Sequence, residues 1–140
     1  METIEEKEKA IEEEFLMFED WTDRYQRIIE IGEENPGLAQ ELKTDDRLVP
    51  GCISRVWLMS EYKNGKLYFY ADSDAAITKG LITLLLKVLS GHRPQEILNA
   101  RLDFIDRIGL RTHLSPSRSN GLANMIKKIK KEAESYAQAA

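Results

Sequence analysis

The chain has 140 residues, of which 42% are hydrophobic and 31% charged, and its formal net charge at pH 7 is −4. This length and composition are typical of one globular domain, so we expect residues 1–140 to form a single domain with its own hydrophobic core. An acidic balance argues against nucleic-acid binding, and the longest apolar run, residues 80–89, is too short to span a bilayer.

The chain contains a single cysteine, Cys52. One cysteine cannot form an internal disulfide, and the acidic N-terminus lacks the pattern of a signal peptide, so we expect a reducing, cytoplasmic location. One cysteine and two distant histidines also do not make a familiar zinc ligand set. We therefore expect no metal site.

Two helices are predicted at the start of the chain. The first has apolar residues at helical spacing: Ile4, Ile11, Phe15 and Phe18. Asp20 can cap the second helix, and Gly32 would offer it a left-handed C-terminal stop. Residues 33–52 have no sustained periodicity and predict a long loop, of a length that is often functional.

From Ser54 the apolar residues alternate with period two, and Asn64–Gly65 is a strong signal for a tight hairpin turn. The aromatic-rich stretch at 66–72 predicts the returning strand.

A central buried helix follows the hairpin. Asp72, Ser73 and Asp74 are all competent caps for its start, and Gly91 closes it. Gly80 lies inside this helix, where glycine is unfavourable, and close packing against another element is the usual reason to tolerate it.

The rest of the chain is predicted to be helical. Pro94 suits the first turn of a short helix that runs through Leu98, whereas in residues 101–110 a helical pattern competes with a glycine. Ser115 or Ser117 can cap the last helix, which has a clear apolar stripe: Leu122, Met125, Ile126, Ile129, Ala133 and Tyr136. The whole pattern predicts an α+β fold in which helices pack on one face of a small antiparallel sheet.

Cys52 is the first candidate for a chemical role. Most free cysteines act as small buried hydrophobic residues. Here, however, Pro50 and Gly51 shape a turn before the thiol, which lies where the loop ends and the sheet begins. No histidine is close in sequence to form a catalytic dyad, so the thiol looks suited to sulfur exchange.

Arg118 and His113 are further candidates. An arginine in the first turn of a helix opposes the helix dipole by about 0.3–1 kcal/mol, which a carboxylate such as Asp72 or Asp74 could offset. His113 fits a hydrogen-bonded structural role better than that of a base. The lysine run at 127–131 is interpreted as a solvated helix face.

Four segments together resemble the SufE family of sulfur-acceptor proteins, which includes CsdE-like members. They are "DWTDRYQRIIEIG", "VPGCISRVWL", "DSDAAITKGLI" and "HLSPSRSNGLANMIKKI". The resemblance covers nearly the whole chain and implies a fold shared with IscU-type scaffold proteins. Ile53 and Arg55 depart from the family, many of whose members have polar uncharged residues at these positions.

The resemblance also implies a function. The protein would not be an enzyme but a sulfur carrier that partners a SufS-like, pyridoxal-phosphate-dependent cysteine desulfurase. Cys52 would accept the persulfide sulfur, stimulate the desulfurase and pass the sulfur to a SufB-type Fe–S scaffold, with no cofactor of its own. Arg118 and Asp74 match family motifs and would position the cysteine loop or the partner, with Gly51 and His113 in support.

Residue chemistry supports this hypothesis in part. A second cysteine would convert a carried persulfide into a disulfide, and this chain has none. A carrier must also protect its persulfide, so we expect Cys52 to be tucked against apolar residues and to be released by loop movement. Two alternatives stay open: a Cys52–His113 hydrolase or transferase with a lowered thiol pKa, and a binding module in which Cys52 is merely buried.

Overall fold

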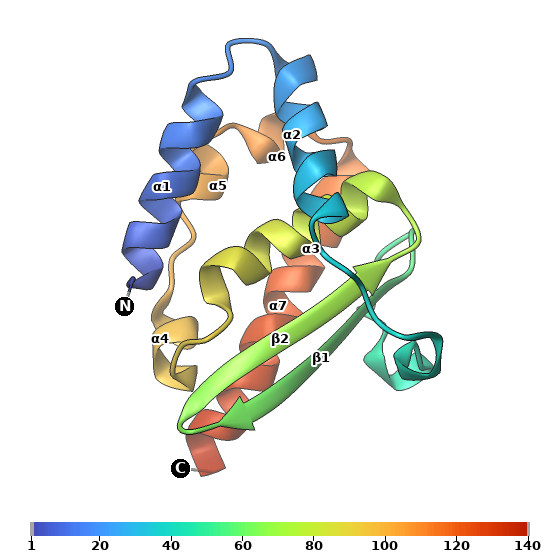
Figure 1. Cartoon of the computed structure of the whole chain (residues 1–140), viewed down its shortest axis with the longest axis vertical. Coiled ribbons are helices and arrows are strands. Elements are labelled where there is room, and N and C mark those ends of the chain that lie inside the picture. Colours follow the sequence, from blue (N-terminus) through green and yellow to red (C-terminus); the bar gives the residue numbers. More distant parts are fainter. Residues whose placement is uncertain (1, 140) are drawn as a thin grey trace.

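The computed structural model describes residues 2–139, which form seven α-helices, two short 3-10 helices and one two-stranded antiparallel sheet (Figure 1). In chain order the elements are α1 (Ile4–Leu16), α2 (Trp21–Glu33), η1 (Gln40–Leu42), η2 (Asp45–Arg47), β1 (Val56–Lys63), β2 (Lys66–Ser73), α3 (Ala76–Leu89), α4 (Pro94–Asn99), α5 (Phe104–Arg107), α6 (Leu110–His113) and α7 (Pro116–Ala139). The α+β prediction is confirmed.

The hairpin forms as predicted around Asn64 and Gly65, whose φ angles of 53° and 79° are those of a tight turn with two left-handed residues. Strand pairing runs from Val56 opposite Ser73 to Lys63 opposite Lys66. One face of the sheet is apolar and buried against the helices, through Val56, Leu58, Leu67, Phe69 and Ala71. The sheet therefore has one core face, as the alternating pattern indicated.

Helix α3 is the central buried helix, and α2 crosses it closely at two glycines. A Cβ on Gly80 would collide with the carbonyl oxygen of Ile28, and one on Gly32 would lie 2.8 Å from the amide nitrogen of Gly80. The prediction that Gly32 ends its helix was wrong, because Gly32 lies inside α2 and is needed there for the close approach of α3.

The start of α3 differs from the prediction. Its N-cap is Ala75, without a side-chain cap. Asp72 instead holds the long loop: it pairs with Lys43 at 3.0 Å and Lys79 at 3.7 Å, and accepts a hydrogen bond from the amide of Leu38. Burial alone would raise the pKa of Asp72, but these hydrogen bonds lower it below its ordinary value.

The C-terminal half follows the predicted order. In the ambiguous segment 101–110, the chain forms the short helix α5 and then turns at Gly109, whose φ is 77°, into α6. The hydroxyl of Ser115 accepts a hydrogen bond from the amide of Arg118 and so caps α7. Among residues 2–139, no helix is long and apolar enough to cross a membrane.

Candidate functional site

Cys52 lies on a turn whose base is fixed by the sheet. The amide of Val49 donates to the carbonyl of Val56, the first residue of β1, at 2.8 Å, so the two ends of the turn are held together. At the tip, Gly51 has a φ of 80°, and its carbonyl accepts a hydrogen bond from the Asn124 side chain at 3.3 Å. A Cβ on Gly51 would strike that amide, which explains the glycine before the cysteine.

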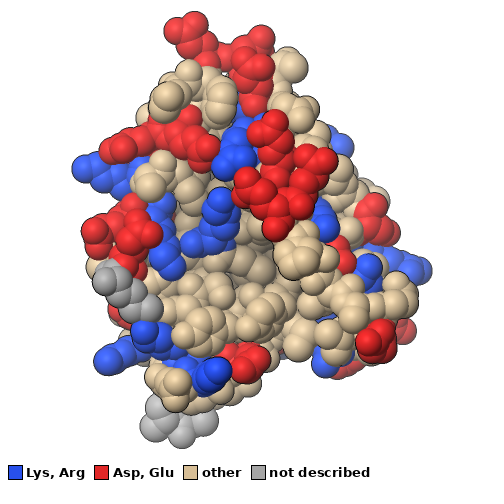
Figure 2. Space-filling view, in the orientation of Figure 1, with Lys and Arg blue, Asp and Glu red and all other residues tan. Residues whose placement is uncertain are grey.

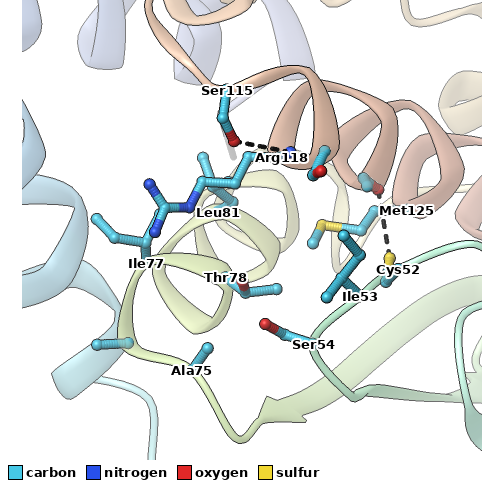
Figure 3. Close-up of a pocket in the computed structure, with 13 residues that line it drawn as sticks. Cys52, Ile53, Ser54, Ala75, Ile77, Thr78, Leu81, Ser115, Arg118 and Met125 are labelled. Atoms are coloured by element: carbon cyan, nitrogen blue, oxygen red, sulfur yellow. Dashed lines mark hydrogen bonds between the residues drawn. The ribbon is translucent and has the colours of Figure 1, made fainter.

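The Cys52 side chain is half-buried and packs against the hydrophobic core. Its Sγ lies 3.7 Å from the carbonyl oxygen of Gly121 on α7, the contact drawn as a dashed line in Figure 3. A Cβ on Gly121 would meet this sulfur at 3.5 Å, an ordinary van der Waals contact, so the thiol lies directly against this turn of α7. The expected apolar surroundings of Cys52 are confirmed, and burial raises the pKa of the thiol above its ordinary value.

The thiol borders an open pocket of about 610 Å³ between the cysteine turn, the start of α3 and the start of α7 (Figure 3). Apolar side chains on its walls include Ile77, Leu81 and Met125. Hydroxyl groups come from Ser54, Thr78, Ser115 and Ser117. Arg118 is the charged residue among those that line the pocket.

Arg118 does not have the carboxylate partner that its position predicted. Asp72 is engaged by two lysines, and Asp74 accepts a hydrogen bond from the amide of Arg55 at 3.0 Å. Within residues 2–139 the Arg118 guanidinium has no ion pair or side-chain hydrogen bond, and it lies beside Ile77 at the edge of the pocket (Figure 3). Its positive charge is therefore available to a group that enters the pocket.

Asp74 closes the base of the cysteine turn. Besides its side-chain contact with the amide of Arg55, its own amide donates to the Arg55 carbonyl at 3.3 Å. The hydroxyl of Ser73 donates to the same carbonyl at 2.7 Å. Three hydrogen bonds thus tie Arg55 to the end of β2, and Asp74 acts on Cys52 through the backbone instead of by contact.

His113 is not among the residues that line the pocket. Its ring stacks on Trp21 at a centroid distance of 4.1 Å, and its Nδ1 lies 2.9 Å from the carbonyl of Gly109, to which it can only donate. Its own carbonyl accepts a hydrogen bond from the Tyr25 hydroxyl. His113 therefore joins α6 to α2.

The structure contradicts the hydrolase hypothesis, which required a histidine-activated thiol. The hydrogen bond that Cys52 makes is to the carbonyl of Gly121, and the pKa of its thiol is raised and not lowered. His92 is no substitute, because it is buried with its Nε2 2.9 Å from the ammonium of Lys7. Among residues 2–139, no three histidine, cysteine, aspartate or glutamate side chains gather in a way that could hold a metal ion.

The model of a known protein family matches most of the chain. Residues 9–133 match the model of the SufE family, described as the Fe–S metabolism associated domain. The chain belongs to the SufE family. The resemblance predicted from sequence is thus confirmed, and the chain carries a domain associated with Fe–S metabolism.

Similar chains span almost the whole length of this SufE-family member. A SufE-like protein of Rhizobium meliloti is 40% identical over 127 residues, which cover 87% of this chain and 91% of the relative. A SufE-like protein of Rhizobium etli is 41% identical, over 91% of this chain and 89% of the relative. The solution structure of a hypothetical protein from Thermus thermophilus has a TM-score of 0.77 at 21% identity, covering 94% of this chain and 96% of that one, and shows the same fold.

Sequence reasoning missed several residues of the site. Gly121 and Asn124 contact the cysteine turn from α7, and Thr78 and Leu81 reach the pocket from α3. A glycine within an otherwise good helix was the available signal for Gly121. No sequence pattern marked the others, because their contacts join segments far apart in the chain.

Proposed function

We propose that this protein accepts sulfur from the persulfide of a pyridoxal-phosphate-dependent cysteine desulfurase, carries it on Cys52 and passes it to a SufB-type Fe–S scaffold. The observation that carries the proposal is the placement of Cys52. The chain's single thiol is half-buried against the core on a glycine-shaped turn, at the mouth of a pocket with room for one more sulfur atom.

The transfer needs no redox cofactor in this chain. The Cys52 thiol gives up its proton, and the thiolate attacks the outer sulfur of the donor persulfide. The donor's S–S bond breaks, its electron pair leaves with the donor cysteine, and that thiolate takes up a proton. Cys52 then carries S–SH, so one sulfur atom has moved and the oxidation levels balance. Clearing its persulfide frees the desulfurase for another turnover, which accounts for stimulation.

The surrounding residues support the two states that a carrier requires. In the free protein, burial raises the pKa of the Cys52 thiol, so it resists oxidation and stray reaction. Reaction requires the turn to leave α7. Gly51 and Asp74 shape and fix this turn, and Arg118 offers a positive charge to the partner or to the persulfide. His113 supports the site by holding the chain just before α7.

Mass spectrometry tests the proposal directly. After incubation with a SufS-like desulfurase and free cysteine, the wild-type protein should gain the mass of one sulfur atom on the peptide that contains Cys52. Cys52→Ser should gain none and should not stimulate sulfide release by the desulfurase. If Cys52→Ser stimulated the desulfurase as well as the wild type, the protein would be a binding module and the carrier proposal would be wrong.

A further inference from the structure

Charge is distributed very unevenly over this acidic protein. Residues 2–34 contain 13 acidic and four basic residues, and Figure 2 shows acidic side chains gathered over α1 and α2. In contrast, residues 116–131 of α7 contain five basic residues and no acidic one. The positive charge is therefore concentrated on the helix that also contacts the cysteine turn.

Part of this charge lies in a groove beside Cys52. Pro50, Asn124, Lys127, Lys128 and Lys131 line a groove of about 230 Å³. Since the Asn124 side chain binds the carbonyl of Gly51, the groove adjoins the cysteine turn directly. Lys127 and Lys131 are exposed and, within residues 2–139, have no ion-pair partner. With Arg118 at the pocket, uncompensated cations flank the thiol on two sides.

An exposed apolar side chain lies next to Cys52 in the chain. Ile53 follows Cys52 directly, lies at the mouth of the pocket (Figure 3), and is 84% exposed. A large aliphatic side chain left in water gains free energy when a partner buries it. Many protein interfaces have an apolar core and a polar rim, in which the buried apolar residues supply affinity and the charges supply steering.

We propose that Ile53 and the basic groove of α7, formed by Lys127, Lys128 and Lys131, are the docking surface for the sulfur donor. This inference rests on the proposed carrier function. The matching surface of the donor would be an apolar recess rimmed by carboxylates. We assign this surface to the sulfur donor and not to the recipient, because the donor meets Cys52 before it is loaded, while the thiol is still protonated and half-buried. Burying Ile53 in the donor would draw the adjacent cysteine out of its pocket.

Single-turnover loading of Cys52 by a SufS-like desulfurase tests this docking surface. The rate of persulfide formation is measured against the concentration of this protein for Ile53→Gln and for the double variant Lys127→Glu/Lys131→Glu. The matched control is Lys9→Glu/Lys63→Glu, which makes the same charge change on α1 and at the hairpin end of the sheet. All five side chains are exposed, and thermal melts of each variant check that folding is unchanged.

The Ile53→Gln variant should need about tenfold more protein for half-maximal loading, at low and at high salt. The lysine variant should need about tenfold more in about 0.01 M salt and less than about twofold more in about 1 M salt, where charges are screened beyond about 3 Å. The control variant should stay within about twofold of the wild type in both. Equal loading of all variants, or an equal loss in the control, would overturn the inference.

The same assays separate this inference from the carrier proposal. If the wild type were not loaded at all, the carrier function itself would be wrong. If the variants loaded normally but passed sulfur slowly to a SufB-type scaffold, the surface would belong to the recipient. If sedimentation showed a wild-type dimer that Ile53→Gln disrupts, the surface would bind a second copy of this chain. Either of these last two results would refute docking of the donor.

Discussion

The turn that holds Cys52 depends on Gly51, and Gly51→Ala should loosen it. With a φ of 80°, any residue that has a Cβ is strained there by about 1–2 kcal/mol. The new Cβ would also push the Asn124 amide away from the Gly51 carbonyl, and an exposed hydrogen bond of this kind contributes about 0.5 kcal/mol. The closed turn should lose about 2 kcal/mol, which makes its open form about 30 times more populated.

Alkylation of Cys52 by iodoacetamide measures the opening of this turn. Its rate in Gly51→Ala should rise by up to about 30-fold, limited by the rate for the unfolded chain. Asn124→Ala removes the hydrogen bond alone and should raise the rate only about two- to threefold. In the double variant Gly51→Ala/Asn124→Ala, the combined effect on the alkylation rate should be smaller than the two single effects added together. The reason is that Asn124→Ala removes the amide with which the new Cβ would collide. A Gly51→Ala rate within about twofold of the wild type would refute the reasoning.

Four further predictions concern titration and packing. The alkylation rate of Cys52 should have its midpoint at a higher pH than in the denatured chain, because burial raises the pKa of the thiol, and a midpoint at or below the denatured value would contradict this. The stability gained from that protonated thiol is complete below the unfolded-state pKa and declines as pH rises, so urea unfolding of Cys52→Ser should depend less on alkaline pH. The pKa of His92 is lowered by burial and by Lys7, so its contribution to stability should be lost as pH falls below about 6.5, and His92→Gln should flatten the acid limb of the unfolding curve. Gly80→Ala should reduce the free energy of unfolding by about 3 kcal/mol in urea, because its methyl group meets the backbone of Ile28, and a loss below about 0.5 kcal/mol would show that α2 and α3 can separate freely.

Local patterns predicted the hairpin and most helices correctly, since their causes are local. Asn64–Gly65 fixes its turn by backbone conformation alone, and Asp20 caps α2 by accepting a hydrogen bond from the amide two residues later. Gly32 was misjudged because glycine has two uses, a left-handed stop and a close approach. Sequence alone does not tell which one a fold needs.

The sequence predicted only those parts of the site whose residues are adjacent in the chain. Gly51 and Cys52 form one turn, and the turn was expected from the sequence. Asp72 and Asp74 were expected to cap α3, but their carboxylates instead accept hydrogen bonds from the backbone amides of Leu38 in the long loop and of Arg55. The contact with Gly121 joins residues 69 positions apart, and periodicity carries no information over that separation.

Because of that separation, the exposure of the Cys52 thiol changes while the chain is being synthesised. Cys52 leaves the ribosome long before Gly121, so the turn emerges with nothing to cover its sulfur on that side. The thiol becomes shielded only when the first turns of α7 dock, which requires synthesis to have passed Gly121. Undocking of those same turns would uncover the sulfur again on the side of Gly121. The last helix is thus the cover of the thiol as well as a wall of the core.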